Sequence, residues 1–227
     1  MSHSVHPYSH RIGVIRDWKS RWFGVNKTYK DSLLADISIR EFLKKELRSY
    51  HVSGIEIERN EKFLRIIVKT ARPGMLIGRN GEGIMALRGK ITKMLQKKGF
   101  PLKKELKLDV EEVRNPESSA AVVAMLVAEG LEKRLPFRRV MKQTIEKVMA
   151  SRDVKGVKIK LSGRLGGAEM ARVEDLKKGQ IPLQTLRADI DFAREQAHMT
   201  YGRIGIKIWI YRGQIFAKDT KKSAQNQ

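Results

Sequence analysis

The feature that most constrains the fold is a glycine-rich stretch, ARPGMLIGRNGEGI, at residues 71–84. Its apolar centre, residues 75–77, is followed by glycines, and Pro73 suits the first position of a helix, where a missing N–H costs nothing. Gly78 and Gly81 can adopt backbone conformations in which a Cβ would clash. The stretch therefore predicts a short helix, a tight turn between these two glycines and a longer helix.

The predicted turn, Gly78, Arg79, Asn80 and Gly81, has the composition of an anion-binding loop. Its glycines let the chain approach a phosphate backbone closely, and the N–H groups of the following helix point to the same place. Arg79 adds a full positive charge. The alternative is an ordinary turn between two helices, because a GxxG spacing alone is common.

The net charge favours the first alternative. The 227 residues include 47 Lys and Arg against 25 Asp and Glu, which gives a net charge of +22 and a pI near 10.3. A compact protein with this self-repulsion is expected to bind a polyanion. Nucleic acid is favoured over a membrane, because no apolar run reaches the roughly 20 residues that span a bilayer.

The length and the remaining composition indicate a globular protein of two domains, each with its own core. The absence of cysteine excludes disulfides and thiol catalysis and is compatible with a reducing cytosol. The N-terminus lacks the apolar segment of a secretory signal, so we expect none.

Residues 1–34 are interpreted as an N-terminal arm in which basic residues alternate with Trp18, Trp22, Phe23 and Tyr29. Such an arm either contacts RNA through its cations and stacks its rings on bases, or folds its rings back onto the core. Three histidines, His3, His6 and His10, have a spacing that could suit a metal. No further ligand completes the set, so we expect no metal site.

Residues 35–112 show the order helix, strand, strand, short helix, GxxG, helix, strand. Apolar residues have helical spacing from about Ala35, strands are predicted at 55–58, 63–68 and 106–110, and Asn60 with Glu61 predicts a turn. The long helix should end at Gly99 and Pro101. This order resembles the type II KH domain, a single-strand RNA-binding module whose GxxG loop clamps the backbone of four nucleotides.

Residues 113–216 predict a second α+β domain of two helices packed on a mainly antiparallel sheet. Asn115 and Pro116 are expected to begin a buried helix through 120–128, and Pro136 to separate it from a second helix. The buried stripe of that helix is predicted to be Phe137, Met141, Ile145, Val148 and Met149. Alternating strands are predicted at 157–161, 186–192 and 204–210, with Tyr201 and Gly202 at the last turn. The polar tail 217–227 is expected to order only on a partner.

Basic residues of the second domain are further candidates for RNA binding. Arg138, Arg139 and Lys142 are three or four residues apart on one helix, where like charges destabilise unless an anion offsets them. A merely solvated basic face is the alternative. Arg164 and Arg172 lie in the glycine-rich segment SGRLGGAEMAR, which suits close approach to a nucleic acid backbone.

Two other classes of function are alternatives for this sequence. Asp189 and Asp191 are the only paired acids that could support metal-assisted hydrolysis by an RNA-processing enzyme. An ion pair with Arg187 and Lys207 is the favoured interpretation, so we expect no catalytic residues, cofactor or enzymatic activity. A free-standing KH-domain RNA chaperone or ribosome assembly factor is the other alternative.

Several runs resemble a known family over nearly the whole chain: TARPGMLIGRNGEGI, PFRRVMK, SGRLGGAEMAR, IPLQTLRADIDFA, TYGRIGIKIWI and an N-terminal VHP…RIG…W…WF. They are similar to small-subunit ribosomal protein three in its bacterial form. This resemblance implies a cytoplasmic ribosomal protein of the small-subunit head that binds 16S rRNA beside proteins ten and fourteen. It also implies that Arg138, Arg139 and Lys142 line the channel through which mRNA enters and help to unwind it.

Overall fold

The computed structural model describes residues 5–60, 62–100 and 105–216. The chain forms two compact units: Trp18–Arg114, called the KH unit below, and Met1–Asp17 together with Asn115–Gln227, called the C-terminal unit. The residues predicted to form an arm, 1–34, are thus divided between the two units. Predictions for His3, Glu61, Pro101 and the tail 217–227 fall outside the described residues.

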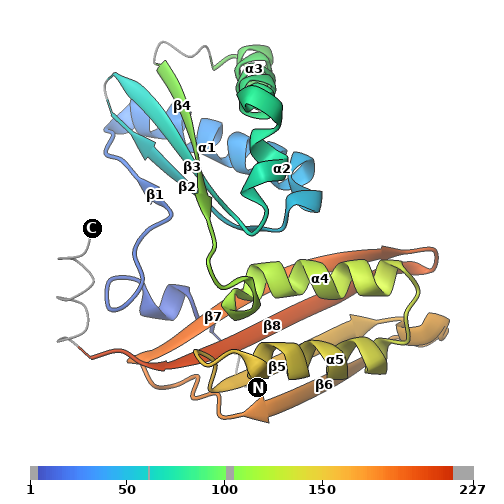
Figure 1. The fold of residues 1–227 in the computed structure, drawn as a ribbon. Helices are drawn as coiled ribbons and strands as arrows, with labels where there is room; N and C mark the ends of the chain where they lie inside the picture. The colour runs from blue at the N-terminus through green and yellow to red at the C-terminus, as the bar shows by residue number, and fades with distance from the viewer. Residues whose placement is uncertain (1–4, 61, 101–104, 217–227) are drawn as a thin grey trace. The chain divides into compact units, whose positions relative to one another are not determined.

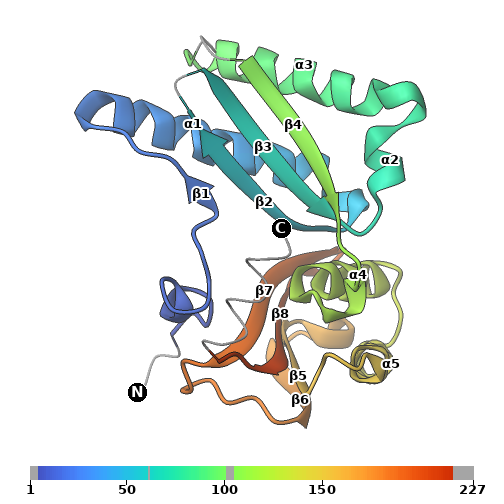
Figure 2. The ribbon, with the colours of Figure 1, turned by 60° about the vertical axis from the view of Figure 1, so that its left-hand side comes forward.

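The KH unit is a four-stranded sheet with helices on one face (Figures 1 and 2). The strands lie in the order β1 (Ser20–Arg21), β2 (Val52–Arg59), β3 (Phe63–Thr70) and β4 (Glu105–Glu112). Only β2 and β3 are antiparallel; the outer pairs are parallel. The helices are α1 (Asn26–Glu46), α2 (Pro73–Ile77) and α3 (Glu82–Lys97). The predicted order of elements is confirmed.

Hydrophobic alternation explains why the helices cover one face only. On β3, Leu64, Ile66 and Val68 are fully buried, while the alternate positions of the strand include the cations Arg65 and Lys69. The buried residues pack against a stripe contributed by α1 and α3: Ile39, Leu43, Leu87, Ile91 and Leu95. Burying an aliphatic side chain stabilises a fold by about 1.5–3 kcal/mol, so this contact supplies much of the unit's stability.

Helix α1 begins at Asn26, earlier than the predicted start near Ala35. The hydroxyl of Thr28 accepts a hydrogen bond from the Val25 N–H at 3.2 Å and donates one to the Val25 carbonyl at 2.7 Å, which fixes the first turn. Ala35 is the first buried residue of the helix. The core-facing pattern therefore starts later than the helix does.

The C-terminal unit is a fully antiparallel sheet with two helices on one face (Figure 1). Helices α4 (Ala120–Glu132) and α5 (Phe137–Ala150) precede the strands β5 (Gly156–Gly163), β6 (Arg172–Gly179), β7 (Ala188–Met199) and β8 (Gly202–Gln214). The strand order is β6-β5-β8-β7. The predicted stripe of α5 is confirmed: Met141, Ile145 and Val148 are buried, and Phe137 and Met149 pack against the same core.

Strand β6 was not predicted as a strand. It is an edge strand that pairs only with β5, and all but one of its residues are exposed. Because neither face of β6 is fully buried, its sequence RVEDLKKG has no clear alternation of apolar and polar residues. The predicted start of α4 also differs. Asn115 and Pro116 form a separate 3-10 turn, and the α4 N–H of Ala120 is capped by the Asp191 carboxylate at 2.8 Å.

A buried arginine attaches the first residues of the chain to the C-terminal unit. Arg11 is fully buried and donates to the carbonyls of Ala188 at 2.7 Å, Leu183 at 2.8 Å, Thr185 at 3.0 Å and Pro7 at 2.9 Å. Burial lowers the pKa of Arg11 from its usual value, although the nearby Asp189 carboxylate opposes that change. One side chain thus satisfies four carbonyl groups, of which those of Pro7 and Ala188 are bonded in a buried environment.

The aromatic residues of the predicted arm do not share one environment. Trp22 donates its Nε1–H to the buried Asp36 carboxylate at 2.8 Å and lies 5.4 Å from the Tyr29 ring, between ring centroids. Trp18 and Phe23 are exposed, at 61% and 91%. Trp22 therefore folds back onto the KH unit, whereas two rings remain at the surface.

We predict that Arg11→Ala lowers the free energy of unfolding of the C-terminal unit by about 3 kcal/mol, because buried carbonyls lose a charged donor. Urea unfolding of the full chain, followed by circular dichroism, measures the change. Arg152→Ala removes an exposed arginine of the same unit and should change stability by less than about 0.5 kcal/mol. Equal effects of the two substitutions would contradict a structural role for Arg11.

Candidate nucleic-acid interface

The predicted anion-binding loop is a tight turn between α2 and α3. Gly78 ends α2 at φ 72°, Asn80 has φ 50°, and Gly81, at φ 80°, is the N-cap of α3. Positive φ is easy for glycine and tolerated by asparagine, which explains these residue types at these positions. Arg79 and Asn80 are both exposed. The predicted sequence of short helix, turn and long helix is confirmed.

Gly83, the last glycine of the stretch, sets the distance between α2 and α3. A Cβ on Gly83 would lie 2.4 Å from the Leu76 carbonyl oxygen and 2.9 Å from that of Ile77. The first turn of α3 therefore packs directly against the last turn of α2. This contact holds the N-terminus of α3 at the loop, where its N–H groups carry a partial positive charge.

The three cations predicted on α5 lie on its exposed face. Arg138, Arg139 and Lys142 are all exposed, while Val140 and Met141, between them in the sequence, are buried. The core side of α5 therefore fixes the helix and directs its cations to solvent. Such an array can neutralise neighbouring phosphates of a nucleic acid strand.

Arg172 extends this cationic face from the neighbouring strand β6. Arg138 and Arg172 each lie 3.5 Å from the same Glu174 oxygen. Their guanidinium carbons also lie 5.6 and 5.3 Å from the centroid of the Phe137 ring. The structure thus brings together two arginines that are far apart in the sequence.

Arg164 lies elsewhere, beside the turn between β7 and β8. Its Nε donates to the Ala168 carbonyl at 2.8 Å, and its guanidinium carbon lies 5.5 Å from the centroid of the Tyr201 ring. A pocket of about 470 Å³ opens here, lined also by Arg134 and Arg203. No acidic residue of the described chain lines this pocket, so it favours an anionic occupant.

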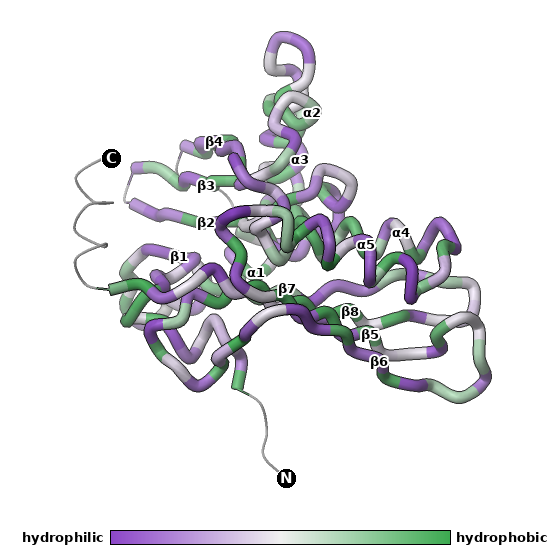
Figure 3. The backbone as a smooth tube through the Cα atoms, turned by 60° about the horizontal axis from the view of Figure 1, so that its bottom comes forward, coloured by the Kyte–Doolittle hydropathy of each residue, from purple (hydrophilic) through white to green (hydrophobic). Residues whose placement is uncertain are grey.

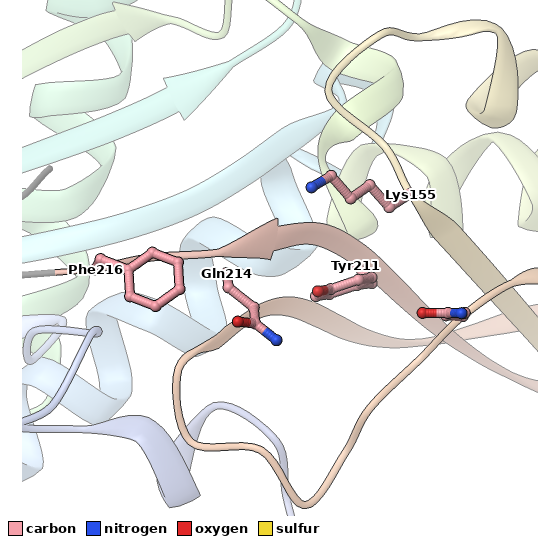
Figure 4. A pocket seen from close by; sticks show the side chains of 5 residues that line it. Lys155, Tyr211, Gln214 and Phe216 are labelled. Atoms are coloured by element: carbon pink, nitrogen blue, oxygen red, sulfur yellow. The ribbon is translucent and has the colours of Figure 1, made fainter.

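A second pocket in the C-terminal unit, of about 450 Å³, has a different lining (Figure 4). It is formed by Lys155, Gln180, Tyr211, Gln214 and Phe216. These residues are scattered along the chain and form no sequence motif, so sequence analysis missed the pocket. It offers one cation, two amides and a phenol, which can bind polar groups but form no acid–base pair.

Asp189 and Asp191, the two acids considered for metal-assisted hydrolysis, form ion pairs within the fold. Asp189 pairs with Arg16, and Asp191 lies 3.2 Å from Arg212 while it caps α4. The predicted ion pairing of these acids is confirmed, but the predicted partners are wrong: they are Arg16 and Arg212, not Arg187 and Lys207. Lys207 is instead opposite Lys160 and Arg194 in the sheet register.

Within residues 5–60, 62–100 and 105–216, no three His, Asp or Glu side chains cluster in a way that could hold a metal ion. Over the same ranges, no helix combines the length and the apolar character needed to cross a bilayer.

Comparison with known proteins gives matches to both units. A family model described as KH domain matches residues 38–118, and one described as ribosomal protein S3, C-terminal domain, matches residues 127–210. Three similar relatives carry the name small ribosomal subunit protein uS3. The Clostridium novyi (strain NT) protein is 46% identical, over 98% of this chain and 96% of its own length. The Clostridium tetani (strain Massachusetts / E88) protein is 45% identical over 100% of both chains. The Caldicellulosiruptor bescii protein is 46% identical, over 98% of this chain and 97% of its own.

We predict that Gly83→Ala destabilises the KH unit by about 1–3 kcal/mol and weakens RNA binding, because α2 and α3 must separate to admit the Cβ. Gly89→Ala is the matched control. It lies on the same helix with open space around its Cβ position and should stabilise by about 0.5–1 kcal/mol. Thermal unfolding and RNA titration measure both effects. Similar stability changes in the two variants would argue against the close helix contact.

Proposed function

The chain belongs to the family of small ribosomal subunit protein uS3, and on that premise we propose that it binds 16S rRNA in the subunit head and lines the channel through which mRNA enters. Members of this family are structural constituents of the small subunit, and the chain is not an enzyme. In this proposal it works in the cytoplasm, within the ribosome, during translation.

The observation that carries the proposal is the exposed cationic face of α5. Arg138, Arg139 and Lys142 are held on a helix whose opposite side is buried, so their positions are fixed relative to the sheet. Like charges at these spacings destabilise a helix by a few tenths of a kcal/mol per pair. RNA phosphates would offset that repulsion, and the nearby Arg172 adds a further cation at the β6 edge.

Unwinding of structured mRNA at this face requires no nucleotide hydrolysis by the chain. Cations on a rigid helix can hold the phosphates of separated strands, while the translocating ribosome supplies the work. Binding by such contacts depends strongly on salt. If six or more phosphates are engaged, affinity should fall roughly a thousandfold or more between 50 and 200 mM salt.

Two other predicted sites support RNA binding. The loop Gly78–Gly81 presents Arg79, exposed glycine backbone and the N-terminus of α3, which together suit a single-stranded RNA backbone. Arg164 and Tyr201 combine a cation with a ring that is 62% exposed, a pairing suited to a nucleotide. We assign both to RNA, with the loop as the KH contribution.

An apolar stripe on α1 supports contact with neighbouring proteins, which we propose to be small-subunit proteins ten and fourteen. Tyr29, Leu33 and Ile37 recur every four residues and are 50%, 39% and 46% exposed; Leu34 beside them is 43% exposed. Exposed aliphatic side chains in a row are costly in water and typical of protein interfaces. RNA would not bury them, whereas a protein partner would.

We predict that Arg138→Ala with Arg139→Ala slows translation through mRNA hairpins and leaves small-subunit assembly intact, because phosphate contacts ahead of decoding are lost. Translation rates on structured and unstructured messages, measured with reconstituted subunits, test this. Equal slowing on both messages, or none on either, would count against the proposal.

We predict that Leu33→Gln with Ile37→Gln lowers the amount of proteins ten and fourteen in assembled small subunits, without unfolding the KH unit. Quantitative mass spectrometry of purified subunits gives the ratio. Leu126→Gln on α4 is a control, since that side chain is 42% exposed but lies in the other unit. Normal amounts of both proteins in the α1 variant would refute this assignment.

A further inference from the structure

A strongly charged surface to which the proposed function gives no role is the face of the C-terminal sheet that is turned away from α4 and α5. Alternation defines this face. On β5, Val157, Ile159 and Leu161 are fully buried against the helices, so Lys158 and Lys160 point to the other side. The alternation of hydrophobic and hydrophilic residues along the strands is visible in Figure 3.

The sheet register extends this assignment to all four strands. The outward cations, called the basic sheet face below, are Lys158, Lys160, Lys177, Arg194, Arg203 and Lys207. In the described register only one carboxylate, that of Asp175, stands among them. A phosphate backbone could therefore meet several cations on one face of the sheet.

Cations face cations directly across the strands. Lys160 is opposite Lys207, Lys207 is opposite Arg194, and Lys158 is opposite Lys177. Like charges in register destabilise a sheet. A surface that only had to be soluble would not need such rows, so their presence favours an anionic partner.

The single acid does not neutralise the face. Asp175 lies 2.8 Å from Lys158. Its pKa is below the usual value, first because of the hydrogen bond and charge of Lys158, and further because of Lys160 and Lys177. One carboxylate is thus shared by three lysines, and positive charge remains.

Aromatic rings lie at the border of the basic sheet face. The ring centroids of Phe192 and Trp209 are 5.1 Å apart. The Lys158 ammonium lies 5.9 Å from the Trp209 ring, and the Arg194 guanidinium carbon 5.3 Å from the Phe192 ring. Beyond these rings the face is covered, since His6 packs edge-on to Phe192 at 4.8 Å. The cationic rows themselves remain outside this cover, with Arg194 and Lys207 exposed.

The KH unit provides an internal comparison, because the uncovered face of its sheet is also charged but neutralises itself. Arg21 lies 2.8 Å from Glu56 and 2.7 Å from Glu58, and these hydrogen bonds raise its pKa. Lys69 lies 2.7 Å from Glu56. Arg65 likewise pairs with Asp109. These three cations have carboxylate partners within the sheet, whereas those of the basic sheet face largely face one another.

We propose that the basic sheet face binds the phosphate backbone of a single strand of RNA, on the side of the sheet opposite to the α5 cations. The proposal rests on the proposed function only in that the chain meets RNA in the small subunit. Ribosomal RNA and mRNA present the same phosphates, and the assembled subunit distinguishes the two sources.

The first test compares two triple variants of the full chain that remove equal charge. Lys160→Gln, Arg194→Gln and Lys207→Gln change the basic sheet face; Arg21→Gln, Arg65→Gln and Lys69→Gln change the KH sheet. The probe is a uridine oligomer of about 20 nucleotides. We expect the first variant to bind roughly tenfold to a hundredfold more weakly at 0.1 M salt, with the salt slope reduced by about 2.

The controls separate local contacts from overall charge and from folding. The first variant should keep the melting temperature of the parent or exceed it, since repulsion is relieved; the second should melt lower. Equal losses of affinity and slope in the two variants would overturn the proposal. The translation test on mRNA hairpins changes other residues, Arg138 and Arg139. A failure of the basic sheet face can therefore be distinguished from a failure of the proposed function.

The second test uses assembled small subunits and measures acetylation of Lys160 and Lys207 by mass spectrometry. We expect protection in subunits without mRNA, relative to the free chain, and loss of protection after ribonuclease treatment. Protection that appears only with mRNA identifies mRNA as the strand and also supports the site. Protection that survives ribonuclease, as a protein partner would cause, or no protection in any sample, would overturn the proposal.

Discussion

Helices cover only one face of each of the two sheets, and this constraint organises the rest of the protein. The aliphatic faces lie under these helices, with Ile66 and Val68 in one core and Ile159 and Ile208 in the other. The opposite faces then have to carry polar residues in a chain with a net charge of +22. Which charges they carry, and how these pair, decides what each surface can bind.

Hydrophobic periodicity predicted the elements that bury a full stripe, because burial imposes a period on the sequence. The α5 stripe around Ile145 and the alternation along β8 are examples. Periodicity failed where burial is absent: the first turns of α1 and the edge strand β6. Periodicity also gave no prediction for Arg11, because three of its four carbonyl acceptors come from segments distant in the sequence.

The candidate site could be predicted from the sequence where local backbone geometry restricts the residue type, but not where residues meet through the tertiary fold. The glycine turn was visible in the sequence because positive φ restricts residue types, and Asn80 and Gly81 follow that rule. Pairings across space were not visible. The partners of Asp189 and Asp191 depend on where Arg16 and Arg212 fall in the tertiary fold, and the link from Arg138 to Arg172 exists only once β6 is beside α5.

The size of the repulsion on the basic sheet face decides its consequence. Like charges opposite one another cost about 0.2–1 kcal/mol per pair, so three such pairs cost at most about 3 kcal/mol. A domain is typically stable by about 5–15 kcal/mol, and the buried aliphatic face contributes more than the repulsion removes. The C-terminal unit should therefore fold without RNA. What the cations of the basic sheet face change is affinity: counterions released from RNA add to binding, and relief of repulsion adds to the stability of the bound protein.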